Sequence, residues 1–326
     1  MNALRLGTRG SPLALAQTEW VARCLRVAGV AAQLVPVPSP GDGYSALRTA
    51  LAAGEVDVAV HSYKDLPVET DPRMVIAAVP QRADPRDALV ARDRMVLGEL
   101  PAGAVLGTGS PRRGRQLLGL GLGLQVVPIR GNVDSRIGQV FAGEVDAVVI
   151  AAAGLDRLGR LDEATELLDP LQMLPAPGQG ALACECRIDD LDTEHLLNAV
   201  LDDAGARAAV TAERALLAAV VAGCGAAVGA LADVVEDLDD DGRVVLRLFL
   251  RGVAATAEGD LLRASATGPY SAAPSSSSAE DSVAPHSDGE LTDAENLGRQ
   301  VAAELLDLVS GALDGRPSAA RPSPTA

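Results

Sequence analysis

One short segment of the chain places a lysine beside an aspartate at the end of an apolar run. Residues 58–67 read Val-Ala-Val-His-Ser-Tyr-Lys-Asp-Leu-Pro, and Lys64 is the only lysine among the 28 basic residues. At the end of a buried strand, such a pair can hold an anion, move a proton or stabilise a developing positive charge. The alternative is an ordinary ion pair on the surface, which contributes little to stability. The segment alone leaves both interpretations open.

Arginines gather between residues 103 and 143, although the chain as a whole is acidic. This stretch holds Arg112, Arg113, Arg115, Arg130 and Arg136 and one acidic residue, Asp134, whereas the net charge of the chain is −16. Several of the arginines follow predicted turns or helix starts, where backbone N–H groups also attract anions. Because arginine forks bind carboxylates in a bidentate way, the pattern indicates a small polycarboxylate or phosphate ligand. A solvated basic face is the alternative.

Cys224 stands between Gly223 and Gly225, just after a predicted helix. Glycines on both sides let the backbone present the thiol openly, so it could serve as a point of covalent attachment. Taken alone, a buried structural cysteine is the more common case. Cys184 and Cys186 lack the second pair that a four-ligand metal site needs, so we expect them to pack in a core and predict no metal.

Two short sequences occur twice in the same order and indicate two related lobes. Gly-Thr-Arg-Gly-Ser-Pro at residues 7–12 resembles Gly-Thr-Gly-Ser-Pro at 107–111, and Ala-Gly-Glu-Val-Asp at 53–57 recurs at 142–146. The first sequence of each pair opens a helix, which Ser11 can cap in the first lobe. The second ends a helix and starts a strand, predicted at 58–60 and at 147–153. Strands that alternate with helices predict mostly parallel sheets, whose ligands bind beyond the carboxyl ends of the strands. We therefore expect the candidate residues around a ligand that lies between the lobes.

The last third of the chain has a different pattern. We expect a helix over 211–222, three strands, a Ser-rich insertion at 269–288 and a final helix opened by a capping box of Thr292 and Glu295. The uncharged run at 215–232 is long enough to suggest a membrane span. Its Ala and Gly content and its central Gly-Cys-Gly favour a helix, a turn and a strand instead.

The composition excludes several classes of function. The chain has 326 residues, of which 48% are hydrophobic and 22% charged, as expected for two or three globular domains. Its net negative charge repels phosphate backbones and anionic lipid, and only 2% of its residues are aromatic, which leaves little surface for base stacking. The N-terminus shows no secretory signal pattern. We expect a cytoplasmic protein with no nucleic-acid or membrane partner.

Nine segments, in order, resemble those of the porphobilinogen deaminases, also called hydroxymethylbilane synthases. They are residues 7–15, 57–67, 84–88, 107–113, 130–136, 153–159, 177–180, 211–214 and 223–224. The resemblance implies an α/β fold with two lobes like those of periplasmic binding proteins and a small α+β third domain. The first lobe would be residues 1–80 with 181–198, the second 86–174, and the third domain 204–312 with the insertion at 269–288. Residues 313–326 would form a disordered tail.

The resemblance also implies a reaction and a cofactor. Members of this family are transferases that join four porphobilinogen molecules head to tail, releasing ammonia, to form hydroxymethylbilane for haem biosynthesis. A dipyrromethane cofactor, made of two such units, is attached by a thioether to the cysteine that matches Cys224. The catalytic aspartate of the family matches Asp65. We expect a monomer with porphobilinogen as its substrate.

The acidic side chains of substrate and cofactor would explain the arginines. By the motif matches, the cofactor is held by Cys224, Lys64, Asp65, Thr108, Ser110, Arg112, Arg113 and Arg136. The substrate or the growing chain is held by Arg9, Ser11, Gln17, Arg130, Asn132 and Arg157.

The chain departs from the family pattern at two places. Residues 38–45 replace a longer glycine-rich segment with basic and aromatic residues, and Pro111 replaces a bulky apolar residue. Two other functions stay open on the sequence: a deaminase of low activity, because of the short segment, and a two-lobed protein that binds a small polycarboxylate without chemistry.

Overall fold

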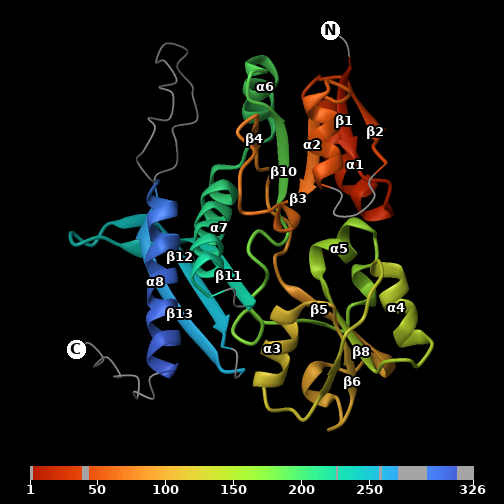
Figure 1. Ribbon diagram of the computed structural model, residues 1–326, viewed down its shortest axis with the longest axis vertical. Helices are drawn as coiled ribbons and strands as arrows, with labels where there is room; N and C mark the ends of the chain where they lie inside the picture. The colour runs from red at the N-terminus through yellow and green to blue at the C-terminus, as the bar shows by residue number, and fades with distance from the viewer. Residues whose placement is uncertain (1–2, 39–43, 225–226, 257–258, 271–291, 314–326) are drawn as a thin grey trace.

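The computed structural model describes residues 3–38, 44–224, 227–256, 259–270 and 292–313. These residues form two five-stranded sheets and one three-stranded sheet. Figure 1 shows a lobe around each five-stranded sheet, one above the other, and a third domain at their side. The predicted α/β class, with two lobes and a small α+β domain, is confirmed. Most of the short segment at 38–45, most of the Ser-rich insertion and nearly all of the expected tail lie outside the described residues.

The sheet of the first lobe draws on two distant parts of the chain. Across the sheet the strands are β2 (Ala32–Pro36), β1 (Leu4–Thr8), β3 (Val58–Ser62), β10 (Leu182–Arg187) and β4 (Met74–Ala78). The helices that pack on it are α1 (Pro12–Val27), α2 (Tyr44–Ala52) and α6 (Leu191–Leu201). As predicted, Ser11 caps α1 by accepting a hydrogen bond from the backbone N–H of Ala14. Cys184 and Cys186 are buried in the core of this lobe, which confirms that they pack.

The first three strands of the second lobe's sheet follow the same order as those of the first lobe. Its strands are β7 (Gln125–Val127), β6 (Val105–Gly107), β8 (Ala147–Ala151), β5 (Asp87–Ala91) and β9 (Glu166–Leu167). Its helices are α3 (Pro111–Gly119), α4 (Val133–Phe141) and α5 (Ala152–Arg157). In both sheets the first three strands are parallel and the fourth, β10 or β5, runs antiparallel to its neighbours. The strand predicted at 147–153 is two residues too long, because β8 ends at Ala151 and the chain continues directly into α5.

The repeated Ala-Gly-Glu-Val-Asp sequence does the same work in both lobes. The carboxylate of Asp57 accepts the backbone N–H of Arg5 at 2.8 Å, and that of Asp146 accepts the N–H of Val105 at 2.7 Å. Each aspartate thereby fixes the start of one parallel strand against the next. The predicted relation between the lobes is confirmed by this shared contact and by the shared order of the first three strands.

The third domain packs two long helices on an antiparallel sheet. The strands β11 (Ala227–Leu238), β12 (Val244–Ala255) and β13 (Leu261–Pro269) are joined in sequence order and covered by α7 (Ala204–Cys224) and α8 (Asp293–Leu313). Helix α7 begins seven residues before the expected position, and β13 extends to Pro269, the first residue of the expected insertion. The predicted capping box is confirmed, since Thr292 and Glu295 exchange hydrogen bonds at the start of α8. Among the described residues, no helix is long and apolar enough to cross a membrane.

One buried carboxylate ties the connections between the lobes to the third domain. Glu213 of α7 is 0% exposed and accepts two hydrogen bonds, of 2.6 and 3.0 Å, from Arg82, which lies between β4 and β5. It also accepts the backbone N–H of Gly178, between β9 and β10, at 2.6 Å and that of Ala232 in β11 at 2.9 Å. Both crossovers between the lobes are therefore held by the same side chain.

Replacing Glu213 by Ala should lower the free energy of unfolding by about 3–5 kcal/mol, because the charge of Arg82 and two backbone N–H groups stay buried without an acceptor. Denaturant titration followed by circular dichroism measures the change. The control is Glu19→Ala, which removes an exposed ion pair with Arg26 and should cost less than about 1 kcal/mol. Equal losses in the two variants would show that Glu213 has no special structural role.

Candidate active site

The candidate residues of the first lobe lie at the carboxyl ends of its parallel strands. After β3 the chain forms a single 3-10 turn, Tyr63–Asp65, as expected for this segment. Gln17 of α1 exchanges hydrogen bonds of 2.8 and 3.1 Å with Ser62, which anchors the start of the turn. Arg9, which follows β1, places its guanidinium 3.5 Å from the carboxylate of Asp65. Asp65 remains about half exposed and therefore accessible to a ligand.

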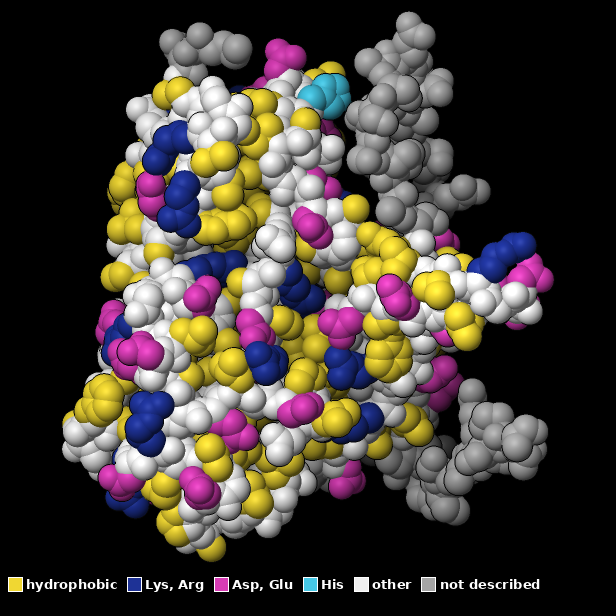
Figure 2. Space-filling model, turned by 180° about the vertical axis from the view of Figure 1, so that it is seen from behind, with side chains coloured by type: hydrophobic (Ala, Val, Ile, Leu, Met, Phe, Trp, Pro, Cys, Tyr) yellow, Lys and Arg dark blue, Asp and Glu magenta, His cyan; other side chains and the backbone are white. Residues whose placement is uncertain are grey.

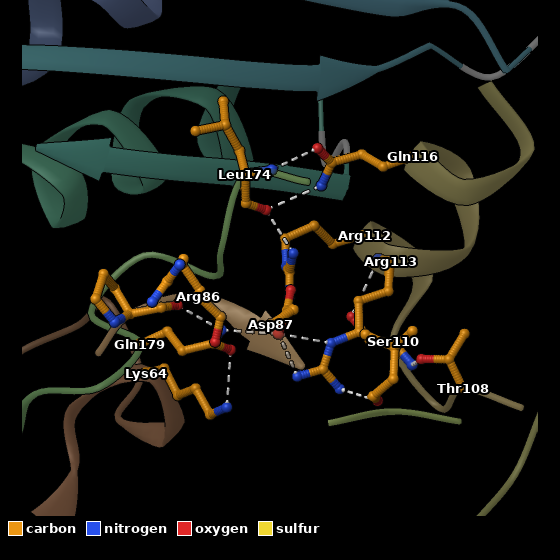
Figure 3. Close-up of polar contacts among 12 residues, drawn as sticks. Lys64, Arg86, Asp87, Thr108, Ser110, Arg112, Arg113, Gln116, Leu174 and Gln179 are labelled. Atoms are coloured by element: carbon orange, nitrogen blue, oxygen red, sulfur yellow. Dashed lines mark hydrogen bonds and ion pairs between the residues drawn. The ribbon is translucent and has the colours of Figure 1, made fainter. Parts of the chain in front are cut away.

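The candidate residues of the second lobe include two buried arginines that share one carboxylate. Arg112 and Arg113, at the start of α3, both contact Asp87 at 2.8 Å, and Asp87 is 0% exposed (Figure 3). Arg112 also donates to the carbonyl of Leu174, and Arg113 to that of Val149. Burial opposes the charge of Asp87, but the two guanidinium groups outweigh it and lower the pKa of this carboxyl. Asp87 stays ionised and, within the described part of the chain, is the carboxylate that pairs with both arginines.

Gln179 connects this cluster to the lysine of the first lobe. Its amide N–H donates to Asp87 at 2.8 Å, and its amide oxygen accepts a hydrogen bond of 3.0 Å from the Nζ of Lys64 (Figure 3). Lys64 therefore reaches across from the first lobe to the charge cluster of the second. Burial and, after it, the charge of Arg113 lower the pKa of Lys64 to about 8. Basic side chains are in excess in this cluster. On the face of the molecule shown in Figure 2, by contrast, acidic and basic side chains are interspersed.

The turn before α3 orders the other two candidates of the second lobe. The hydroxyl of Ser110 accepts the backbone N–H of Arg113 and caps α3, and the hydroxyl of Thr108 accepts the N–H of Ser110. Pro111 occupies the first helical position, where proline is favourable because its missing N–H has no partner to lose. The departure at Pro111 therefore fits the local geometry. Gly109 is also required, because a Cβ there would lie 2.7 Å from the carbonyl oxygen of Ile129.

The remaining candidates surround this cluster at different depths. Arg136 donates to the carbonyl of Gly131, and burial followed by the charge of Arg113 lowers its pKa. Arg157 donates to the carbonyl of Gly180 at 2.7 Å, and burial lowers its pKa to about 10. Arg130 is exposed, and Asn132 is an exposed residue whose side chain caps α4. Ser11 is likewise exposed at the start of α1.

Two residues of the cluster have no role in the sequence-based prediction. Asp87 and Gln179 lie in the segments 84–88 and 177–180 that carry the family resemblance. Asp87 lies outside residues 103–143, the stretch in which the arginines gather, so the sequence gives no sign that it is their counterion. Cys224 is the last residue of α7, and its side chain lies outside the described residues. Among the residues that are described, no group of His, Cys, Asp and Glu is arranged to hold a metal ion.

Comparisons with known proteins agree with this site. Residues 4–195 match the family "Porphobilinogen deaminase, dipyromethane cofactor binding domain". A porphobilinogen deaminase of Nocardia farcinica is 56% identical over 319 residues, which cover 94% of this chain and 86% of that protein. One from Mycobacterium tuberculosis is 51% identical, with 94% and 96% covered. Among solved structures, a periplasmic substrate-binding protein from Coxiella burnetii is similar with a TM-score of 0.42 and 17% identity, covering 60% of this chain and 91% of that one.

The two-lobed α/β fold and the cofactor-domain match define a transferase that works with a dipyrromethane cofactor. The identity to curated relatives over nearly the whole chain narrows this further: the chain belongs to the porphobilinogen deaminase family. The interpretation as a binding protein without chemistry is therefore set aside.

The lowered pKa of Lys64 can be measured directly, because the chain has only one lysine. In folded protein without cofactor, the single resonance of ¹³C-labelled lysine should titrate near pH 8, whereas an unperturbed lysine titrates near about 10.4. Arg113→Met should raise this pKa because it removes the nearby cation. Arg115→Met changes an exposed arginine of the same helix and should leave it unchanged. A titration near 10.4 in the folded wild-type protein would contradict the charge cluster.

Proposed function

We propose that the charge cluster around Asp87 receives the carboxylates of the cofactor and that Asp65 acts on the substrate beside it. The reaction of the family condenses four porphobilinogen molecules head to tail, with release of ammonia, to hydroxymethylbilane, and the chain is an enzyme of this reaction. The observation that carries the proposal is the excess of positive charge: Arg112 and Arg113 share the carboxylate of Asp87, and Lys64 is joined to this cluster through Gln179.

The residues present fit an anionic cofactor. The pKa values of Lys64, Arg112 and Arg136 are all lowered, first of all by burial, so each charge lacks the stabilisation that water would supply. The buried Nε of Arg112 also has no hydrogen-bond acceptor among the described residues. Carboxylates bound here would stabilise these cations. We assign Lys64, Ser110, Arg112, Arg113 and Arg136 to the carboxylates of the cofactor, with Thr108 ordering the turn.

Dipyrromethane supplies a covalently held pyrrole end to which new units are added. We propose that the thiol of Cys224 carries it, since this cysteine matches the attachment residue of the family and ends the helix that Glu213 fixes to both crossovers. Porphobilinogen carries acidic side chains, for which we propose Arg9, Ser11, Arg130, Asn132 and Arg157 as ligands. Gln17 holds Ser62 and with it the turn that presents Asp65.

We assign to Asp65 the stabilisation of a positive charge on the reacting pyrrole. Its carboxylate is accessible, and the guanidinium of Arg9 lies 3.5 Å away as its ion-pair partner. Loss of ammonia from porphobilinogen leaves a cation, and a fixed carboxylate beside it stabilises that charge without reorganisation. Asp65 would also accept hydrogen bonds from the pyrrole N–H groups of the substrate and of the cofactor. These bonds would hold both rings beside its carboxylate.

We further propose that the enzyme is a monomer of the cytoplasm and that residues 38–45 make a short lid. Residues 39–43 lie outside the described residues, so the effect of this segment rests on the sequence. Because this segment has no basic side chains, it contributes little to the binding of an anionic pyrrole chain. We therefore expect a raised KM for porphobilinogen.

The attachment is tested by the intact mass of purified protein. Wild-type protein should exceed its sequence mass by two porphobilinogen units less their ammonia, and Cys224→Ser should lack this increment. Cys24→Ser is the control because Cys24 is partly buried and packs against the core of the first lobe, and this variant should keep the full increment. Unmodified wild-type protein from cells that produce porphobilinogen would refute the attachment.

Asp65→Asn should retain the cofactor and lose turnover. Removing one preorganised charge at the reacting centre predicts a loss in kcat on the order of 10² or more, with a smaller change in KM. Stopped assays of hydroxymethylbilane, read as uroporphyrin after oxidation, measure both constants. Glu69→Gln removes an exposed carboxylate four residues further along and should keep kcat within about twofold. Turnover like that of the wild type in a cofactor-loaded Asp65→Asn protein would exclude the role.

A further inference from the structure

A second cavity lies against the segment that carries Lys64 and Asp65. Its volume is about 640 Å³, within the range of small-molecule sites, and Tyr63, Leu66 and Pro67 line it, whereas Lys64 and Asp65 do not. Helices α7 and α8 of the third domain supply another wall. The cavity thus lies between the first lobe and the third domain and contacts the catalytic turn through the residues that flank its reactive pair.

The wall of the cavity combines apolar surface with arginines. Leu66, Val68, Ile76 and several alanines of α7 form the apolar part. Arg48, Arg214 and Arg299 form the basic part, opposed by Glu69 and Glu295.

Two of these five charges are already engaged. Arg48 forms a bidentate contact with the buried Glu185, and Glu295 accepts the capping hydrogen bonds of Thr292. Glu295 keeps its negative charge in the capping box, so Arg214 and Arg299 share the cavity wall with two carboxylates, Glu69 and Glu295.

Arg214 links the cavity to the catalytic turn. Its guanidinium donates to the carbonyl oxygens of Leu66, at 2.9 Å, and Pro67, and lies 5.6 Å from the centre of the Tyr63 ring. Among the described residues it forms no ion pair, and burial lowers its pKa, so its charge is poorly stabilised. Only two of its five N–H groups are used by these carbonyls, which leaves donors for an anion.

We propose that this cavity binds a small organic carboxylate with an apolar body and that the bound ligand lowers the rate of the reaction. The carboxylate takes up N–H groups of Arg214 and the charge of Arg299, while the apolar body covers Leu66 and the alanines of α7. Because Arg214 also holds the carbonyls of Leu66 and Pro67, a ligand that draws its guanidinium into the cavity weakens these two hydrogen bonds and loosens the turn that positions Asp65. The effect falls on kcat, since the ligand and porphobilinogen occupy different sites. The binding does not depend on the reaction proposed above.

Calorimetric titration of the cofactor-loaded enzyme with 1-naphthoate tests the binding. We expect one saturable site. Ala218→Phe should abolish binding by filling the cavity from an exposed position of α7, and Arg299→Gln should weaken it roughly fivefold, as expected for one partly screened charge. Gln300→Glu is the matched control: it changes the net charge by the same amount on the neighbouring residue, outside the cavity wall, and should leave the affinity unchanged. Absence of saturable binding, or binding that ignores both cavity variants, overturns the proposal.

Steady-state kinetics test the action. At saturating porphobilinogen, 1-naphthoate should reduce kcat to a plateau in the wild type, and the reduction should need more ligand in Arg299→Gln. If 1-naphthoate raises KM and leaves kcat unchanged, the ligand binds in the catalytic site, and the proposal is overturned. Binding with the expected variant pattern but unchanged kcat overturns the regulatory part and leaves the site. A wild-type enzyme without hydroxymethylbilane synthesis would refute the proposed function, and the calorimetric result would stand apart from it.

Discussion

The charge of the active site depends on one buried carboxylate. Asp87 accepts hydrogen bonds from Arg112, Arg113 and Gln179, and Gln179 holds Lys64 in turn. Asp87 carries one negative charge against the two charges of Arg112 and Arg113, and in the interior this imbalance is screened less than it would be in solvent. The unbalanced charge favours anionic ligands, and without Asp87 the arginines would repel each other and could not stay buried together. Asp87 thereby holds together the cations that we propose for the cofactor carboxylates.

The local features of the fold could be predicted from the sequence. Ser11 and Thr292 each stand before a helix in a pattern whose hydrogen bonds are made within one turn, and both cap as expected. The repeated pentapeptide has the same structural role in both lobes, because Asp57 and Asp146 each accept a backbone N–H of the neighbouring parallel strand, β1 or β6. Such features depend on a few neighbouring residues or on a comparison of the chain with itself.

The long-range contacts of the site could not be predicted in this way. Asp87 lies 25 residues before Arg112, and Gln179 lies 115 residues after Lys64. Their meeting depends on where the two crossovers run, and no periodicity or composition encodes that. Glu213 shows the same limit: a glutamate in an apolar helix marks an unusual position, but its partners come from both crossovers and from β11. The sequence resemblance identified the segments, whereas the structure shows which side chains within them meet.

The place of β10 in the first sheet has a consequence for synthesis on the ribosome. This strand comes after the whole second sheet in the chain, yet it lies between β3 and β4 and pairs with both. The strands of the second lobe, residues 87–167, are therefore all made before the first lobe can close. Until β10 emerges, β3 and β4 each present an unpaired edge, the kind of surface that pairs with other chains. The N-terminal lobe is thus the last of the two to complete its sheet, and a nascent chain needs protection longest at the end that was made first.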